Sequence, residues 1–171
     1  MPHSLKRSLA ALASLALIPT AVAATRVGAP ISGTVTNTTY SSSGAFHGAV
    51  DITGECNVDP VHAPFPGAWN VTIRTASVVC YGNGSGNQNE AKHVFADGFT
   101  FRLWHFIKTD KSYDRTCTNN CVLGLVGGTG NATGPHVHMQ LDKNGTNSTS
   151  WYSGYTVKGE FLSLDETVGN I

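Results

Sequence analysis

Residues 126–138 read Val-Gly-Gly-Thr-Gly-Asn-Ala-Thr-Gly-Pro-His-Val-His, a glycine-rich turn that leads into two histidines one residue apart. Successive side chains of a strand point to opposite faces, so His136 and His138 share one face if this segment is a strand. Far upstream, His47 and Asp51 occur in the run His-Gly-Ala-Val-Asp. Two imidazoles and one carboxylate can hold Zn²⁺ with a position left open for water. The combination indicates a metallohydrolase.

The glycines of this turn do not form a phosphate-binding loop. No Lys-Ser/Thr pair follows Gly127, Gly128 and Gly130, and no helical pattern begins there. We expect these glycines to adopt positive φ in a turn that brings the backbone close to the metal site.

Length and charge narrow the class of protein. The chain has 171 residues, which is enough for one domain. It carries 11 Lys and Arg against 11 Asp and Glu, so the formal net charge is zero. This balance, without any run of basic residues, argues against a nucleic-acid partner. Gly, Ser, Thr and Asn are abundant, and this composition favours strands and turns over helices.

Residues 1–23 have the pattern of a secretory signal peptide. Lys6 and Arg7 precede an apolar run over residues 9–18, and Ala-Val-Ala at 21–23 forms a small-residue cleavage site. The apolar run is about ten residues long, against roughly twenty needed to span a bilayer. We therefore expect a secreted protein with no membrane span after signal removal, whose mature domain covers residues 24–171.

The four cysteines of an exported domain are expected to form two disulfides. Cys117 and Cys121 are close enough in sequence to close a short loop, which would leave Cys56 with Cys80. The sequence alone permits three pairings. A metal site made of these thiols is disfavoured because no Cys-x-x-Cys motif occurs.

The mature region predicts an all-β fold of mostly antiparallel sheets. Asp97-Gly98 is a strong two-residue hairpin signal between two of the expected strands. We expect strands at residues 31–35, 49–52, 60–67, 69–81, 92–96, 99–107, 122–126 and 136–141. No stretch has a convincing amphipathic helix pattern. In the polar C-terminal segment, the aromatic residues are expected to cover a sheet edge; they are Trp151, Tyr152, Tyr155 and Phe161.

Four segments of the chain resemble, in the same order, the lysostaphin/LytM-type zinc endopeptidases, which cut peptide cross-links in bacterial cell walls. The matching segments are residues 47–52, 60–67, 103–106 and 126–138. The resemblance extends over residues 44–141, the core of a single zinc metallopeptidase-like domain. It implies the duplicated hybrid motif fold and a hydrolase that acts on peptide bonds.

The resemblance also implies a role for each of five residues. His47, Asp51 and His138 correspond to the zinc ligands of the family. His105 and His136 correspond to two catalytic histidines that do not bind the metal and flank its water. Imidazoles in those positions can accept a proton from the water, pass it to the leaving amine, or stabilise an oxyanion.

Two features separate this chain from its expected relatives. Gln140 follows the final His-Met pair, where the family more often has an acidic residue. Cys56 and the small disulfide-containing format also resemble the leukocyte cell-derived chemotaxins, which keep the zinc triad and act as binding proteins. Those proteins lack the middle histidine, whereas this chain keeps His105. The expectation is a monomeric enzyme acting on peptidoglycan or another peptide, and the alternative is a catalytically silent, zinc-binding secreted protein.

Overall fold

The computed structural model describes residues 24–171, and these residues contain strands and turns but no helix. The predicted signal peptide at residues 1–23 lies outside the described residues. The strands are β1 (Arg26–Gly28), β2 (Gly33–Asn37), β3 (Val50–Thr53), β4 (Pro60–His62), β5 (Gly67–Thr72), β6 (Glu90–Val94), β7 (Phe99–Trp104), β8 (Tyr113–Cys117), β9 (Val122–Leu125), β10 (His136–Lys143), β11 (Thr146–Ser148), β12 (Phe161–Leu162) and β13 (Thr167–Asn170). Within residues 24–171 nothing has the helical length and apolarity needed to cross a membrane.

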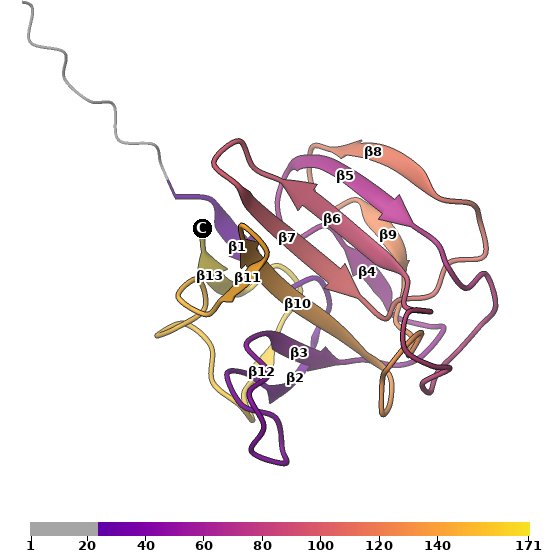
Figure 1. Cartoon of the computed structure of the whole chain (residues 1–171), viewed down its shortest axis with the longest axis horizontal. Helices are drawn as coiled ribbons and strands as arrows, with labels where there is room; N and C mark the ends of the chain where they lie inside the picture. The colour runs from indigo at the N-terminus through magenta and orange to yellow at the C-terminus, as the bar shows by residue number, and fades with distance from the viewer. Residues whose placement is uncertain (1–23) are drawn as a thin grey trace, which may run out of the picture.

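One large sheet carries most of the structure, with strand order β12-β2-β3-β10-β7-β6-β5-β8 and with β11 added to one end of β10. All its pairings are antiparallel. Strand β10 lies near the middle of this sheet, between β3 and β7 (Figure 1). Two small sheets, β1-β13 and β4-β9, complete the fold. The expected all-β, antiparallel architecture is therefore confirmed.

The two-residue period of β10 separates core side chains from polar ones. Val137, Met139 and Leu141 are 2% exposed or less and belong to the hydrophobic core. The residues between them, with even numbers, are His136, His138, Gln140 and Asp142. Because neighbouring strands are paired in register, the same alternation in β3 and β7 adds Asp51, Arg102 and Trp104 to this polar face.

The expected long strand at residues 69–81 is wrong in its second half. Strand β5 ends at Thr72, and the chain leaves the sheet because a buried side chain captures its backbone. Oδ1 of Asn89 accepts hydrogen bonds from the backbone N–H groups of Arg74 and Thr75, each at 2.9 Å. The alternation of apolar residues beyond Thr72 therefore does not reflect a ladder of strand hydrogen bonds.

The C-terminal segment covers the core with two of its four aromatic residues. Trp151 and Tyr152 are 2% exposed, and the Trp151 ring packs edge-on against Phe101 with centroids 5.1 Å apart. Tyr155 and Phe161 are exposed, and Trp151 packs on β7, an inner strand, so the expectation that these aromatics cover a sheet edge is wrong.

Both disulfides have the pairing favoured by the sequence. Cys117 bonds to Cys121, and Cys56 bonds to Cys80 across 24 residues of chain. The second bridge ties the connection between β3 and β4 to the long segment between β5 and β6. Backbone contacts then hold that segment against the glycine-rich turn, as the hydrogen bond from Gly128 N to Val79 O (2.7 Å) illustrates.

The Cys56–Cys80 disulfide closes the longer loop, so its removal should cost more stability than removal of Cys117–Cys121. A disulfide limits the entropy of the unfolded chain, and this effect grows with loop length. Replacing Cys56 and Cys80 together with Ser should lower the free energy of unfolding by about 3 kcal/mol. The matched pair Cys117→Ser/Cys121→Ser should cost about 2 kcal/mol on the same basis. Urea unfolding of both variants measures the difference, and a larger loss from the short loop would contradict this ranking.

Candidate metal centre

Three side chains converge on one point of the polar face from two strands and a loop. His138 on β10 is paired in register with Asp51 on β3, so alternation alone brings both side chains to the same face. His47 reaches them from the turn before β3, where Gly48 adopts a φ of 69°. Nε2 of His47 lies 3.0 Å from Oδ2 of Asp51, and Nδ1 of His138 lies 2.9 Å from Oδ1. The carboxylate therefore bridges the two imidazoles.

The Asp51 carboxylate is ionised although it is buried. Burial alone would raise its pKa, but hydrogen bonds from His138 and His47 hold the pKa far below its usual value. Nδ2 of Asn37 donates a further hydrogen bond to Oδ2 at 2.8 Å. Asp51 thus presents a fixed negative charge between two aromatic nitrogens, the kind of donor set that zinc takes in proteins.

Outer partners orient the rings of three histidines in the same way. Nδ1 of His47 donates to the carbonyl of Thr38 at 2.8 Å. In the same way, Nδ1 of His105 donates to the carbonyl of Thr129 (2.7 Å), and Nδ1 of His136 to that of Gly134 (2.8 Å). A carbonyl oxygen accepts only, so in each neutral ring Nε2 keeps the lone pair. Each ring consequently offers Nε2 to a metal or a proton.

His105 arrives at the site by a turn and not by strand alternation. Its neighbour Trp104 is the residue of β7 paired with His138, and the two rings stack at 4.8 Å with 9° between their planes. Strict alternation would place His105 on the opposite face. The chain instead leaves β7 at His105 with a φ of 74°, in the left-handed region, which brings this ring back toward His136. His105 therefore reaches the neighbourhood of the metal site, where the family resemblance implied it, through this turn and not through alternation.

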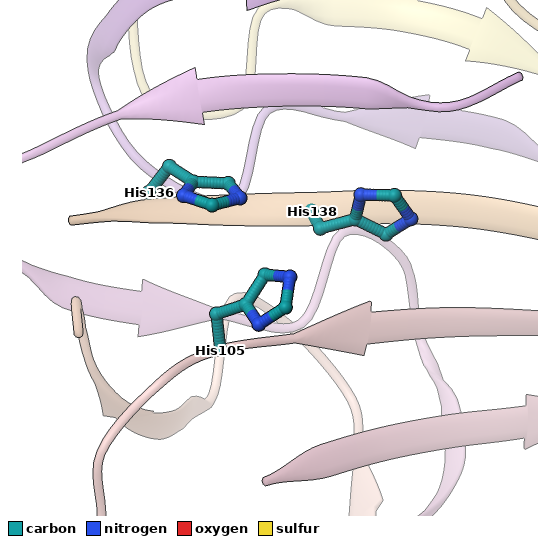
Figure 2. A group of neighbouring side chains, drawn as sticks. All are labelled: His105, His136 and His138. Atoms are coloured by element: carbon teal, nitrogen blue, oxygen red, sulfur yellow. The ribbon is translucent and has the colours of Figure 1, made fainter. Parts of the chain in front are cut away.

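His105 and His136 lie beside the Asp51 group and not within it. Their ring centroids are 4.7 Å apart, and Figure 2 shows His105 reaching toward His136 and His138 from the end of β7. His105, His136 and His138 also form a group whose nitrogens lie within 4.8 Å of one another, as do the donor atoms of His47, Asp51 and His138. Only the second group contains an ionised carboxylate, so it is the better cation site and leaves His105 and His136 free.

The five residues open into a pocket of about 350 Å³. Its walls come from the segment between β5 and β6 and from the glycine-rich turn; besides the site residues and Trp104 they are Ser85, Gln88, Asn131, Ala132 and Thr133. The glycines of the turn work mainly through close approach. A Cβ at Gly128 would lie 2.4 Å from the Cys80 carbonyl oxygen, whereas Gly130 alone of the three has a positive φ, 81°. The walls added by these two connections carry no charged side chain.

Three residues support the site through contacts to which the sequence analysis assigned no role. Asn37 orients Asp51, Thr129 orients His105, and Gln140 contacts His138. Only the last carries a usable signal, since Gln140 follows His138 with the strand period of two.

Burial of His105 predicts a pH-dependent stability of the zinc-free protein. Burial, followed by the charge of His136, lowers the pKa of His105 from 6.5 to about 4. As the pH falls through this range, the unfolded chain binds a proton that the folded protein does not. The free energy of unfolding should therefore fall by roughly 3 kcal/mol between pH 7 and pH 4 on account of this residue.

The difference between wild type and His105→Gln isolates this contribution, because the other titrating groups are common to both proteins. Urea unfolding at pH 7 and pH 4, with chelator present, measures it. Equal losses of stability in the two proteins would show that His105 titrates normally.

The structure is similar to that of a known peptidase domain. The catalytic domain of the prophage-encoded M23 protein EnpA from Enterococcus faecalis, solved as a mutant, is 24% identical, with a TM-score of 0.50 over 71% of this chain and 92% of that one. This likeness shows the fold, which is that of an M23 peptidase domain, and agrees with the fold implied by the lysostaphin/LytM-type resemblance.

Two other solved structures are more distant. A protein from Pseudomonas aeruginosa assigned to peptidase family M23 is 22% identical, and a zinc containing peptidase from Vibrio cholerae is 17% identical; both have a TM-score of 0.47 over 72% of this chain. The chain covers 47% and 39% of their lengths. No family model and no curated protein sequence matches the chain.

Proposed function

We propose that this chain is a secreted zinc metalloendopeptidase that hydrolyses peptide bonds in bacterial peptidoglycan cross-links. The observation that carries the proposal is the convergence of His105 and His136 on an oriented His47–Asp51–His138 group. A protein that only bound zinc would need the group of three, whereas hydrolysis also needs residues that move a proton. The fold shared with the EnpA catalytic domain is consistent with this activity.

The donor atoms fit zinc. Nε2 of His47, the Asp51 carboxylate and Nδ1 of His138 would hold the ion, since each has an outer partner that fixes its orientation. Zinc in such a site polarises a scissile carbonyl and acidifies a water molecule.

The remaining residues can then handle the proton. His105 and His136 are each held through Nδ1, so in the neutral ring each keeps the lone pair on Nε2. Such a nitrogen accepts a proton from the attacking water as general base. The same ring, once protonated, becomes an N–H donor that can stabilise the oxyanion or protonate the leaving amine. The uncharged pocket walls accept a peptide without demanding a charged side chain.

Clearing of purified bacterial cell walls tests this function. The zinc-loaded protein should lower the turbidity of a wall suspension, a chelator should stop the reaction, and added zinc should restore it. New amino termini in the soluble fraction would identify the bond that is cut. If a protein with one zinc per chain leaves walls and glycine-rich peptides intact, the enzyme proposal is wrong and the chemotaxin-like binding role remains.

Secretion and oligomeric state form part of the same proposal. Protein recovered from the medium of an expressing cell should begin at Ala24, as N-terminal sequencing would reveal, and should run as a monomer in size-exclusion chromatography. Retention of residues 1–23 in the exported protein would contradict signal removal.

A further inference from the structure

The geometry points to Gln140 as a positioning residue that selects which nitrogen of His138 is free to bind the metal. This inference rests on the proposed role of His138 as a zinc ligand. Gln140 touches neither the pocket nor Asp51, and it acts through His138 alone. The inference is based on the direction of a series of hydrogen bonds between side chains along one face of β10.

Three consecutive residues of that face are joined side chain to side chain. Nε2 of His138 lies 3.1 Å from Oε1 of Gln140, and Nε2 of Gln140 donates to Oδ1 of Asp142 at 2.6 Å. Their spacing of two residues places the three side chains in a row, as the strand period requires. His138 and Asp142 are buried and Gln140 is half-buried, so each contact is partly shielded from solvent.

The direction of these hydrogen bonds follows from what each group can do. A carboxylate only accepts, so Gln140 must turn its NH₂ group toward Asp142 and its carbonyl oxygen toward His138. An amide oxygen also only accepts, so Nε2 of His138 must carry the hydrogen. Nδ1 of His138 lies 2.9 Å from Oδ1 of Asp51 and donates to it in the metal-free site. Because Gln140 holds the hydrogen on Nε2, Nδ1 is the nitrogen that can give up its hydrogen and take a metal.

His138 is therefore the reverse of the other three site histidines. His47, His105 and His136 are each held through Nδ1 and offer Nε2. His138 is held through Nε2 and offers Nδ1. Without an acceptor at Gln140, a neutral His138 ring could lose its hydrogen from Nε2 and keep the one on Nδ1 that it donates to Asp51. That arrangement would block a metal from this nitrogen.

Asp142, the last residue of this hydrogen-bonded series, is fixed by an ion-pair network on the neighbouring strands. Nε of Arg102 donates to Oδ2 of Asp142 at 2.7 Å, and the same guanidinium pairs with Glu90. Burial alone would lower the pKa of Arg102, but its bonds to Asp142 and Glu90 raise it, so the guanidinium stays charged. Nε1 of Trp104 donates to Glu90 at 3.1 Å.

The network leads back to His138 through Trp104. The ring of Trp104 stacks on His138, while the strand register pairs Gln140 with Arg102 and Trp104 with both His138 and Glu90. Asp142 therefore cannot turn away from Gln140 without breaking its bond to Arg102. The orientation of the Gln140 amide is thus set by charged groups that take no part in the reaction.

Removing the acceptor tests the inference by zinc affinity and by spectroscopy, without any activity assay. Gln140→Leu should weaken zinc binding by about 10–100-fold, measured by competition with a chromogenic chelator. In the zinc-loaded protein, the Nε2–H of His138 should be hydrogen-bonded and exchange slowly with solvent in wild type, as NMR would show. In Gln140→Leu the same hydrogen has no acceptor and should exchange faster. A role of Gln140 in folding alone would leave this exchange rate unchanged.

Moving the carboxylate from position 142 to position 140 should restore zinc affinity. Gln140→Glu alone places two carboxylates side by side and should bind zinc less tightly than wild type. Combining Gln140→Glu with Asp142→Asn restores the order of donors and acceptors. The new amide at position 142 can donate to the new carboxylate at position 140, and that carboxylate can accept from His138. The double variant should recover zinc affinity to within about threefold of wild type, whether or not Gln140→Leu folds.

The outcomes separate this inference from the proposed function. Unchanged zinc affinity in folded Gln140→Leu, or an unchanged exchange rate of the His138 Nε2–H, would overturn the positioning role alone. Failure of the double variant to recover affinity would do the same. Failure to cut walls, with zinc affinity and exchange rate as expected, would overturn the enzyme and leave the positioning role in place. A wild type that binds no zinc would overturn both.

Discussion

Asp51→Ala should lose zinc binding and wall hydrolysis together. The carboxylate lies within 3.0 Å of both His47 and His138, and it is the one negative charge of the three-residue group. Its removal leaves two neutral imidazoles, and zinc affinity should fall by more than about 100-fold, since even the loss of an outer partner costs 10–100-fold. Metal analysis after dialysis and the turbidity assay measure the two losses.

The matched control for this variant is Asp110→Ala. The Asp110 side chain is 73% exposed, pairs with Lys108 and lines no part of the metal pocket, so zinc content and activity should be unchanged. Asp51→Asn adds a variant of the same shape without the charge, which should also bind zinc poorly. If Asp51→Ala retained one zinc per chain after dialysis, the ligand assignment would have to be abandoned.

His105→Ala should keep its zinc and lose most of its activity. The residue contacts His136 and lies outside the His47–Asp51–His138 group, so the ion remains bound. Loss of a group that moves a proton in the transition state should lower kcat by about 10²–10⁴-fold. Zinc content and wall clearing, measured on the same sample, separate these two effects.

His62→Ala is the matched histidine control. His62 lies on β4, where Nδ1 bonds to the Asn120 carbonyl, and it is not part of the pocket. Its replacement should leave activity unchanged. Wild-type clearing by His105→Ala would show that His136 suffices, and it would remove the main distinction from a chemotaxin-like binding protein.

The parts of the site that lie on strands could be predicted from the sequence. A period of two places His136 and His138 on one face. The family resemblance implied that Asp51 joins His138, and the register of β10 with β3 explains how. The pairing of Cys56 with Cys80 also agreed with the sequence, because the short spacing of the other two cysteines left it as the simplest choice.

The parts that depend on departures from regular strands could not be predicted. His105 reaches the site because its φ is positive, and a histidine at this position gives no sequence signal for that conformation. Strand β5 ends early because Asn89, which lies 17 residues beyond Thr72, captures the backbone of Arg74 and Thr75. Gln140 stood out from the sequence as a departure from the family pattern, but its direction depends on Asp142. In each case a distant partner decides the local conformation.

The division of β10 into a core face and a polar face has a consequence for how this protein can change over evolution. Val137, Met139 and Leu141 secure the fold, while the chemistry depends on the residues between them. The pocket walls are separate from both, because Ser85, Gln88 and residues 131–133 lie on connections outside the sheet. If the proposed function holds, selection can therefore alter which peptide is accepted while the scaffold and the reaction are inherited unchanged.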